Sequence, residues 1–126
     1  MRFFSKNKYF FILLLIFVLG AFLRFYELPQ RFLYTHDHDL QAWIVKDILV
    51  NKHLRLIGQE TSTSGVFIGP FYYYLLIPFY LIFRMDPIGT AVFSSILGLF
   101  GIFSFYFIFS KTYGKKAGLI AATLYA

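Results

Sequence analysis

The sequence contains no cysteine. Disulfide bonds, a thiol nucleophile and a lipid-modified cysteine anchor are therefore all excluded. Charged residues are also scarce, at 14% of the 126 residues, and only six of them are acidic. A domain that folds in water normally has about a quarter of its residues charged. The sequence therefore does not have the composition of an ordinary soluble domain.

What the sequence has in abundance is apolar and aromatic residues: 59% are hydrophobic, and 18 are phenylalanine and 10 tyrosine. They occur in long blocks rather than at helical or strand spacing, which indicates lipid as the solvent. The formal net charge of +6 does not indicate a nucleic-acid partner, because the basic residues flank the apolar blocks as they do at membrane edges. We predict an all-α, polytopic integral membrane protein.

The first apolar block predicts a transmembrane helix over residues 9–26. The segment before it is basic, with Arg2, Lys6 and Lys8 and no acid. This charge predicts that the N-terminus lies on the cytoplasmic side of a plasma (cell) membrane. The neutral loop that follows is then predicted to lie on the extracytoplasmic side. The alternative is a secretory signal peptide cleaved near residues 18–20. The apolar block continues through that point, which favours a retained helix.

The external loop, residues 27–65, predicts a juxtamembrane surface helix over residues 37–50. Thr35 or Asp37 would cap its start. Its apolar residues form a broad arc that Asp47 interrupts, so the helix is only weakly amphipathic. It fits the membrane surface or a place under other protein. The residues of this arc are Leu40, Trp43, Ile44 and Ile48.

Residues 35–39 (THDHD) form the densest ionisable cluster in the chain. Two carboxylates and two imidazoles could hold a divalent cation or supply a general base. The alternative is an ordinary solvated loop. In a helix, Asp37 and Asp39 would point to nearly opposite sides, whereas in an extended segment they would share one side. We therefore predict one working carboxylate with at most one helper.

Residues 59–65 predict a flexible polar loop, and residues 66–83 a second transmembrane helix. Pro70 fits the start of that helix, and Pro78 predicts a kink. The three tyrosines at 72–74 predict either an interfacial aromatic belt or the wall of a sugar site.

Residues 84–87 predict a tight turn, and residues 88–110 a third transmembrane helix. Its small residues, which predict close helix packing, are Gly89, Ser94, Ser95, Gly98, Gly101 and Ser104. A basic turn over residues 111–116 precedes a fourth helix that starts at residues 117–126. Three spans place this basic turn outside, against the positive-inside tendency. Because the sequence stops within a helix, we expect it to be the N-terminal part of a larger protein and inactive by itself.

The order of these features resembles the GT-C superfamily of glycosyltransferases. The resemblance is carried by residues 23–26 (LRFY), the Asp-led loop helix, and residues 69–76 (GPFYYYLL) at the start of the second span. The chain is most similar to the group of protein O-mannosyltransferases and the lipid A aminoarabinose transferase. That group has an Asp-Glu pair in the first external loop. Asp37 matches the Asp, whereas His38 stands at the second position and the next acid is Asp39.

The resemblance implies an inverting enzyme that transfers a sugar from a polyprenyl-phosphate donor to an extracytoplasmic acceptor, which would be a glycolipid, polymer or protein. Asp37 would be the general base, with His38 and Asp39 as supporting residues or ligands of a divalent metal ion. A basic residue (Arg24, Arg31 or Lys52) would offset the donor phosphate. The other residues expected to contact donor or acceptor are Gly69, Pro70 and Tyr72.

Two other classes of protein remain open. A transporter or channel segment would use the 35–39 cluster as an ion site at its mouth, and would carry further ionisable residues inside its spans. The three predicted spans have none beyond their ends. A non-enzymatic membrane anchor subunit would need no chemistry at the cluster.

Overall fold

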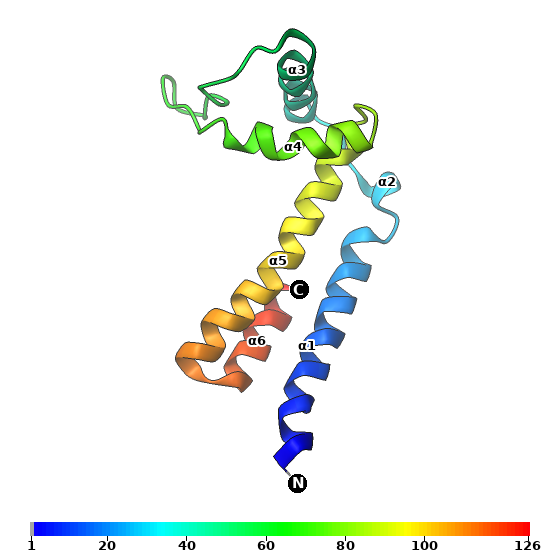
Figure 1. The fold of residues 1–126 in the computed structure, drawn as a ribbon, viewed down its shortest axis with the longest axis vertical. Helices are drawn as coiled ribbons and strands as arrows, with labels where there is room; N and C mark the ends of the chain where they lie inside the picture. Colours follow the sequence, from blue (N-terminus) through cyan, green and yellow to red (C-terminus); the bar gives the residue numbers. More distant parts are fainter. Residues whose placement is uncertain (1) are drawn as a thin grey trace. The chain divides into compact units, whose positions relative to one another are not determined.

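The computed structural model describes residues 2–126, and the side chains of residues 8–126. The side chains of Arg2 and Lys6, on which the predicted cytoplasmic N-terminus depends, lie outside this described part. The described chain is all-helical (Figure 1), apart from an isolated antiparallel bridge between Glu60 and Phe67. The helices are α1 (Arg2–Phe25), α2 (Leu28–Arg31), α3 (His36–Asn51), α4 (Phe71–Ile82), α5 (Ile88–Tyr113) and α6 (Lys115–Tyr125).

The chain forms two compact units, one of which is a single continuous segment. The segment through Leu28 and Ser94–Ala126 form the first, which we call the terminal unit. Pro29–Phe93 form the second, which we call the central unit. Helix α5 begins in the central unit and continues into the terminal unit.

The terminal unit contains α1, α6 and most of α5, packed around a small apolar core. The buried residues of this core are Leu13, Ile16, Ile102, Leu119 and Ala122. Gly20 and Gly98 let the helices approach closely, since a Cβ at Gly20 would overlap the Ile102 side chain and one at Gly98 would overlap Arg24. Gly98 and Gly101 were expected to be packing positions, and the structure gives both this role.

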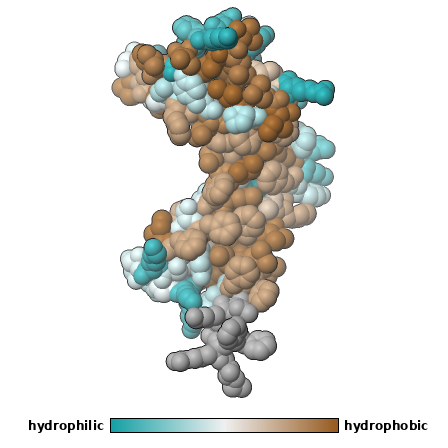
Figure 2. Space-filling model, in the orientation of Figure 1, coloured by the Kyte–Doolittle hydropathy of each residue, from teal (hydrophilic) through white to brown (hydrophobic). Residues whose placement is uncertain are grey.

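Helices α1 and α5 are long and apolar enough to cross a membrane, over Lys8–Phe25 and Ile88–Tyr113. A signal sequence or a buried helix of a soluble protein can meet the same test, but only a small share of either segment is buried. Figure 2 shows hydrophobic residues over most of the visible surface of α1 and α5. The first and third predicted spans therefore coincide with helices that fit a membrane in length and composition.

The second predicted span is not confirmed. Helix α4 has 12 residues, or about 18 Å at 1.5 Å per residue, whereas a bilayer core is about 30 Å thick. The shortening is at its N-terminal side, because residues 66–70 precede the helix and Pro70 is its N-cap. Pro78 does lie inside the helix, as expected.

In the central unit, α3 packs on α4 around a second apolar core. Its buried residues are Val45, Ile48, Tyr73, Leu76, Tyr80 and Phe93. The helix expected over residues 37–50 is present and extends one residue further at each end, with Thr35 as its N-cap. Of the residues in the expected apolar arc, Ile48 faces the core together with Val45, whereas Trp43 is exposed.

The polar segment 59–65, which was predicted to be a loop, is closed by backbone hydrogen bonds at its base. Gly58 N–H donates to Ile68 O at 2.9 Å, and Ile68 N–H donates to Gln59 O at 3.0 Å. Gly65, at φ +79°, forms the tip, where its N–H donates to Glu60 Oε1 at 2.7 Å. The segment is therefore an irregular hairpin, and this places Gln59 toward α3.

Candidate functional site

Asp37 lies in the first turn of α3, and its side chain is exposed. The helix dipole favours a negative charge at this end. Gln59 Nε2 donates a hydrogen bond to Asp37 Oδ1 at 3.3 Å. Because this partner is a neutral amide, it orients the carboxylate without neutralising it. The structure therefore presents the Asp37 side chain to solvent, oriented by Gln59.

His38 serves as a helix cap. Its Nδ1 accepts a hydrogen bond from Thr35 N–H at 3.2 Å and lies 2.8 Å from Thr35 Oγ1. This is the place that glutamate or glutamine usually takes in a capping box. The His38 ring also contacts Phe32 edge-on, with centroids 4.8 Å apart. Since Nδ1 accepts here, the proton of the neutral ring is on Nε2.

Asp39 has a different partner from Asp37. Tyr34 Oη donates a hydrogen bond to Asp39 Oδ1 at 2.9 Å, and this bond raises the pKa of Tyr34 above its ordinary value. Because the helix begins at His36, both acids are helical and point apart, as the helical alternative required. Among the described residues, no group of three or more His, Cys, Asp or Glu could hold a metal ion.

A buried pair of hydroxyls supports the start of α3, and sequence reasoning missed it. Tyr80 Oη donates to His38 O at 3.4 Å, and Thr90 Oγ1 donates to Tyr80 Oη at 2.9 Å. Thr90, at the start of α5, is buried. A lone threonine near a helix start gives no signal of this role. The pair connects the position of Asp37 to the core between α3 and α4.

The segment at the start of α4 lies in the same unit as Asp37. Gly69 is exposed and Pro70 is half-buried. The Tyr72 ring meets Tyr73 and Phe93, with centroids 6.3 and 5.8 Å apart. Tyr73 is buried, and Tyr74 Oη donates to Arg55 O at 2.8 Å. The three tyrosines therefore pack in the central unit rather than forming one continuous exposed wall.

Arg24, by contrast, belongs to the terminal unit. Its Nη1 donates to Ala126 O at 2.7 Å and to Gly20 O at 3.2 Å, and its guanidinium lies 5.7 Å from the centroid of the Tyr125 ring. The side chain thus binds the backbone carbonyls of Gly20 in α1, of Tyr125 in α6 and of Ala126. Its expected contact with a donor phosphate stays a prediction.

Sequence reasoning also missed a cluster around Asp47. Asn51 Nδ2 donates to Asp47 Oδ1 at 2.9 Å, and Asp47 Oδ2 lies 3.2 Å from His53 Nδ1 and 3.3 Å from Arg55 Nη2. The Asn51 hydrogen bond, with the nearby His53 and Arg55 charges, lowers the pKa of Asp47. The only sequence signal was the polar break that Asp47 makes in the apolar arc of the helix.

This lowered pKa predicts a dependence of stability on pH. Because the pKa is lower in the folded chain than the ordinary value of 3.8, the ionised Asp47 stabilises the fold above that value, and the contribution disappears as the pH falls through the folded pKa. We expect wild type to be more stable than an Asp47→Asn variant near pH 7, and the difference to vanish in acid. Thermal unfolding at a series of pH values checks this, and a pH-independent difference would contradict it.

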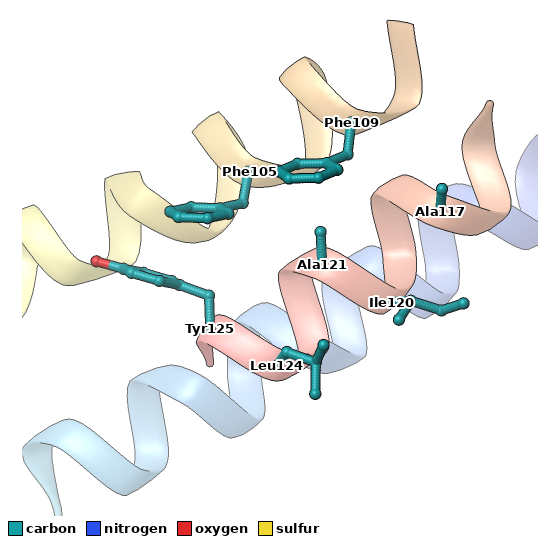
Figure 3. A pocket seen from close by; sticks show the side chains of 7 residues that line it. All are labelled: Phe105, Phe109, Ala117, Ile120, Ala121, Leu124 and Tyr125. Atoms are coloured by element: carbon teal, nitrogen blue, oxygen red, sulfur yellow. The ribbon is translucent and has the colours of Figure 1, made fainter. Parts of the chain in front are cut away.

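An apolar groove of about 470 Å³ lies in the terminal unit (Figure 3). Its rings include Phe105 and Tyr125, which stack with centroids 4.6 Å apart. The side chains that line it carry no carboxylate, imidazole or amine. The remaining lining residues are Phe109, Ala117, Ile120, Ala121 and Leu124. The groove offers apolar contact and no acid–base chemistry.

Comparisons with known proteins add no family assignment: no family model, no curated protein and no solved structure matches this chain.

Proposed function

We propose that the protein transfers a sugar from a polyprenyl-phosphate donor to an acceptor at the extracytoplasmic face of the plasma membrane. The observation that carries this proposal is the exposed Asp37 carboxylate at the start of α3, oriented by the neutral amide of Gln59. Its unit is joined at both ends to helices that fit a membrane. A charged base at a water–membrane boundary can meet both a lipid-linked donor and a polar acceptor.

In the proposed reaction, Asp37 takes the proton of an acceptor hydroxyl while that oxygen attacks the anomeric carbon of the sugar. The bond between the anomeric carbon and the phosphate oxygen breaks, and the polyprenyl phosphate leaves with the electron pair. Attack opposite the leaving group inverts the anomeric configuration. Arg31 or Lys52, both exposed in the central unit, would offset the phosphate charge. His38 acts as a cap, and Asp39 is the alternative base.

The test uses membranes from cells that express the complete gene product. They are supplied with radiolabelled sugars on polyprenyl phosphate, and label is followed into endogenous acceptors, with membranes lacking the protein as the control. We expect transfer that depends on the protein. Equal transfer in both membranes, across several donor sugars, would leave a non-enzymatic anchor as the better explanation.

We further propose that only α1 and α5 cross the membrane before α6, with the central unit outside. The structure brings two basic segments to one end of the terminal unit, because Lys115 Nζ lies 5.6 Å from the centroid of the Tyr9 ring. Hydrophilic side chains mark the end that carries the α5–α6 turn (Figure 2). Two spans place this turn in the cytoplasm with the N-terminus, as the positive-inside tendency requires.

Labelling of single cysteines tests this topology, because residues 1–126 contain no cysteine and any cysteine elsewhere in the complete protein is replaced by serine. Ser64→Cys lies in the central unit and Thr112→Cys at the end of α5, and both side chains are exposed. A membrane-impermeant maleimide should label Ser64→Cys in intact cells, and Thr112→Cys only after permeabilisation. If α4 also spans, both variants would be labelled in intact cells.

A further inference from the structure

Helix α3 has an outward face that takes no part in the apolar core of the central unit. Val45 and Ile48 pack on α4, whereas Trp43 and Val50 are 63% and 68% exposed. Large apolar side chains also continue past the end of the helix, where Leu54, Leu56 and Ile57 are exposed. A run of this kind on one unit differs from the single exposed apolar residues that soluble proteins tolerate.

The outward face also carries positive charge next to its aromatic ring. Lys46 Nζ lies 5.3 Å from the centroid of the Trp43 ring. Arg55 comes from the segment after the helix, and the one acid nearby, Asp47, is already paired with it and with His53. These side chains surround a depression of about 320 Å³, whose other lining residues are Leu40, Ile44, Val50 and Asn51. The face therefore combines apolar surface with cations.

The connectivity of the chain indicates that the membrane is the partner close to this face. Helix α1 ends at Phe25, and α5 begins at Ile88, so the central unit is tethered by short links to both proposed spans. A unit held in this way stays next to the bilayer surface. Lipid headgroups provide phosphates for Lys46 and an interfacial layer that suits an indole ring.

We propose that the outward face of α3, formed by Trp43, Lys46, Val50 and Arg55, docks on the membrane surface, with Trp43 at headgroup depth and Lys46 near lipid phosphates. This inference rests on the proposed spans of α1 and α5. It gives the central unit a fixed height at the membrane, and so places the start of α3, with Asp37, within reach of the headgroup layer.

Trp43 is the only tryptophan among residues 1–126, and any tryptophan elsewhere in the complete protein is replaced by phenylalanine so that the fluorescence reports on this face alone. The complete protein is reconstituted into vesicles that contain phosphatidylglycerol and phosphatidylcholine, with or without lipids brominated near the top of the acyl chains. Acrylamide serves as the water-soluble quencher. We expect blue-shifted emission that brominated lipid quenches strongly and acrylamide weakly.

Substitution of Lys46 tests the charge contribution. One basic residue near an anionic surface changes the partition by about fivefold, so Lys46→Gln should shift the docked fraction by about this factor in anionic vesicles. In purely zwitterionic vesicles the same substitution should have little effect. Lys116→Gln, in the first turn of α6 in the other unit, is the matched control and should leave the quenching of Trp43 unchanged.

Two results would overturn the docking proposal. In the first, the emission is that of a water-exposed indole and acrylamide quenches it. In the second, neither quencher reaches the indole, which would show that other protein covers Trp43. Resistance of the protein to carbonate extraction is measured on the same vesicles. If the protein is extracted, the proposed spans fail and docking fails with them. If it resists extraction while Trp43 is exposed to water, docking alone is wrong.

Discussion

Replacing Asp37 by asparagine is expected to lower sugar transfer by about 10²–10⁴-fold, the usual contribution of a positioned general base. Asparagine has nearly the same shape, and its amide oxygen can still accept the hydrogen bond that Gln59 donates to Asp37. What it loses is the ability to take a proton from the acceptor. Transfer of radiolabelled sugar in membranes, normalised to the amount of protein, measures the effect.

Two control variants make this result specific. Asp39→Asn keeps an acceptor for the Tyr34 hydroxyl, so its effect should be much smaller. Glu27→Gln removes an exposed carboxyl outside the 35–39 cluster and should leave transfer unchanged. Full activity of Asp37→Asn, with loss in Asp39→Asn, would instead assign the general base to Asp39.

The second large effect is expected from Leu76→Ala. Leu76 is 0% exposed, in the core that holds α3 on α4. Truncating a fully buried leucine typically costs about 2–5 kcal/mol, through lost burial and the cavity that remains. The central unit should therefore lose much of its stability. Hydrogen exchange of the α3 and α4 backbone amides, in detergent or in a reconstituted bilayer, measures the loss of protection.

Leu81→Ala is the matched control on the same helix, since Leu81 is 58% exposed. Its substitution should change amide protection by far less than that of Leu76. Equal effects would mean that α4 packs on its Leu81 side, for example against lipid or another part of the protein, and that the core described for the central unit is incomplete.

The helices that the sequence predicted correctly were those with a strong local signal. The uncharged block of residues 9–23, which continues past Arg24, indicated α1, and the longer uncharged block of residues 88–110 indicated α5. Thr35 followed by acids in the first turn indicated the start of α3. Helix α4 is shorter than predicted, because a run of apolar residues does not show by itself where a helix begins. Val66 and Phe67 are apolar, yet they belong to the hairpin that ends at Pro70.

The site was predictable only in part. The sequence identified the acids of residues 35–39. It also predicted that Asp37 and Asp39 would point to nearly opposite sides if the segment were helical, and in α3 they do. It did not show that His38 would cap the helix, because histidine rarely takes this place, nor that Gln59 would return to Asp37 across 22 residues of chain. Contacts that depend on tertiary folding leave no periodic pattern in a sequence.

The division into a continuous central unit and a terminal unit built from both ends has a consequence for biosynthesis. Pro29–Phe93 can fold as soon as this segment has been made, because it is continuous and its apolar core is formed by its own residues. Helix α1 is made first, but Arg24 finds its partner Ala126 only 102 residues later. Until then Leu13 and Ile16 lack their core partners on α5 and α6. Within residues 1–126, the helix that emerges from the ribosome first is thus packed only after α6 has been made.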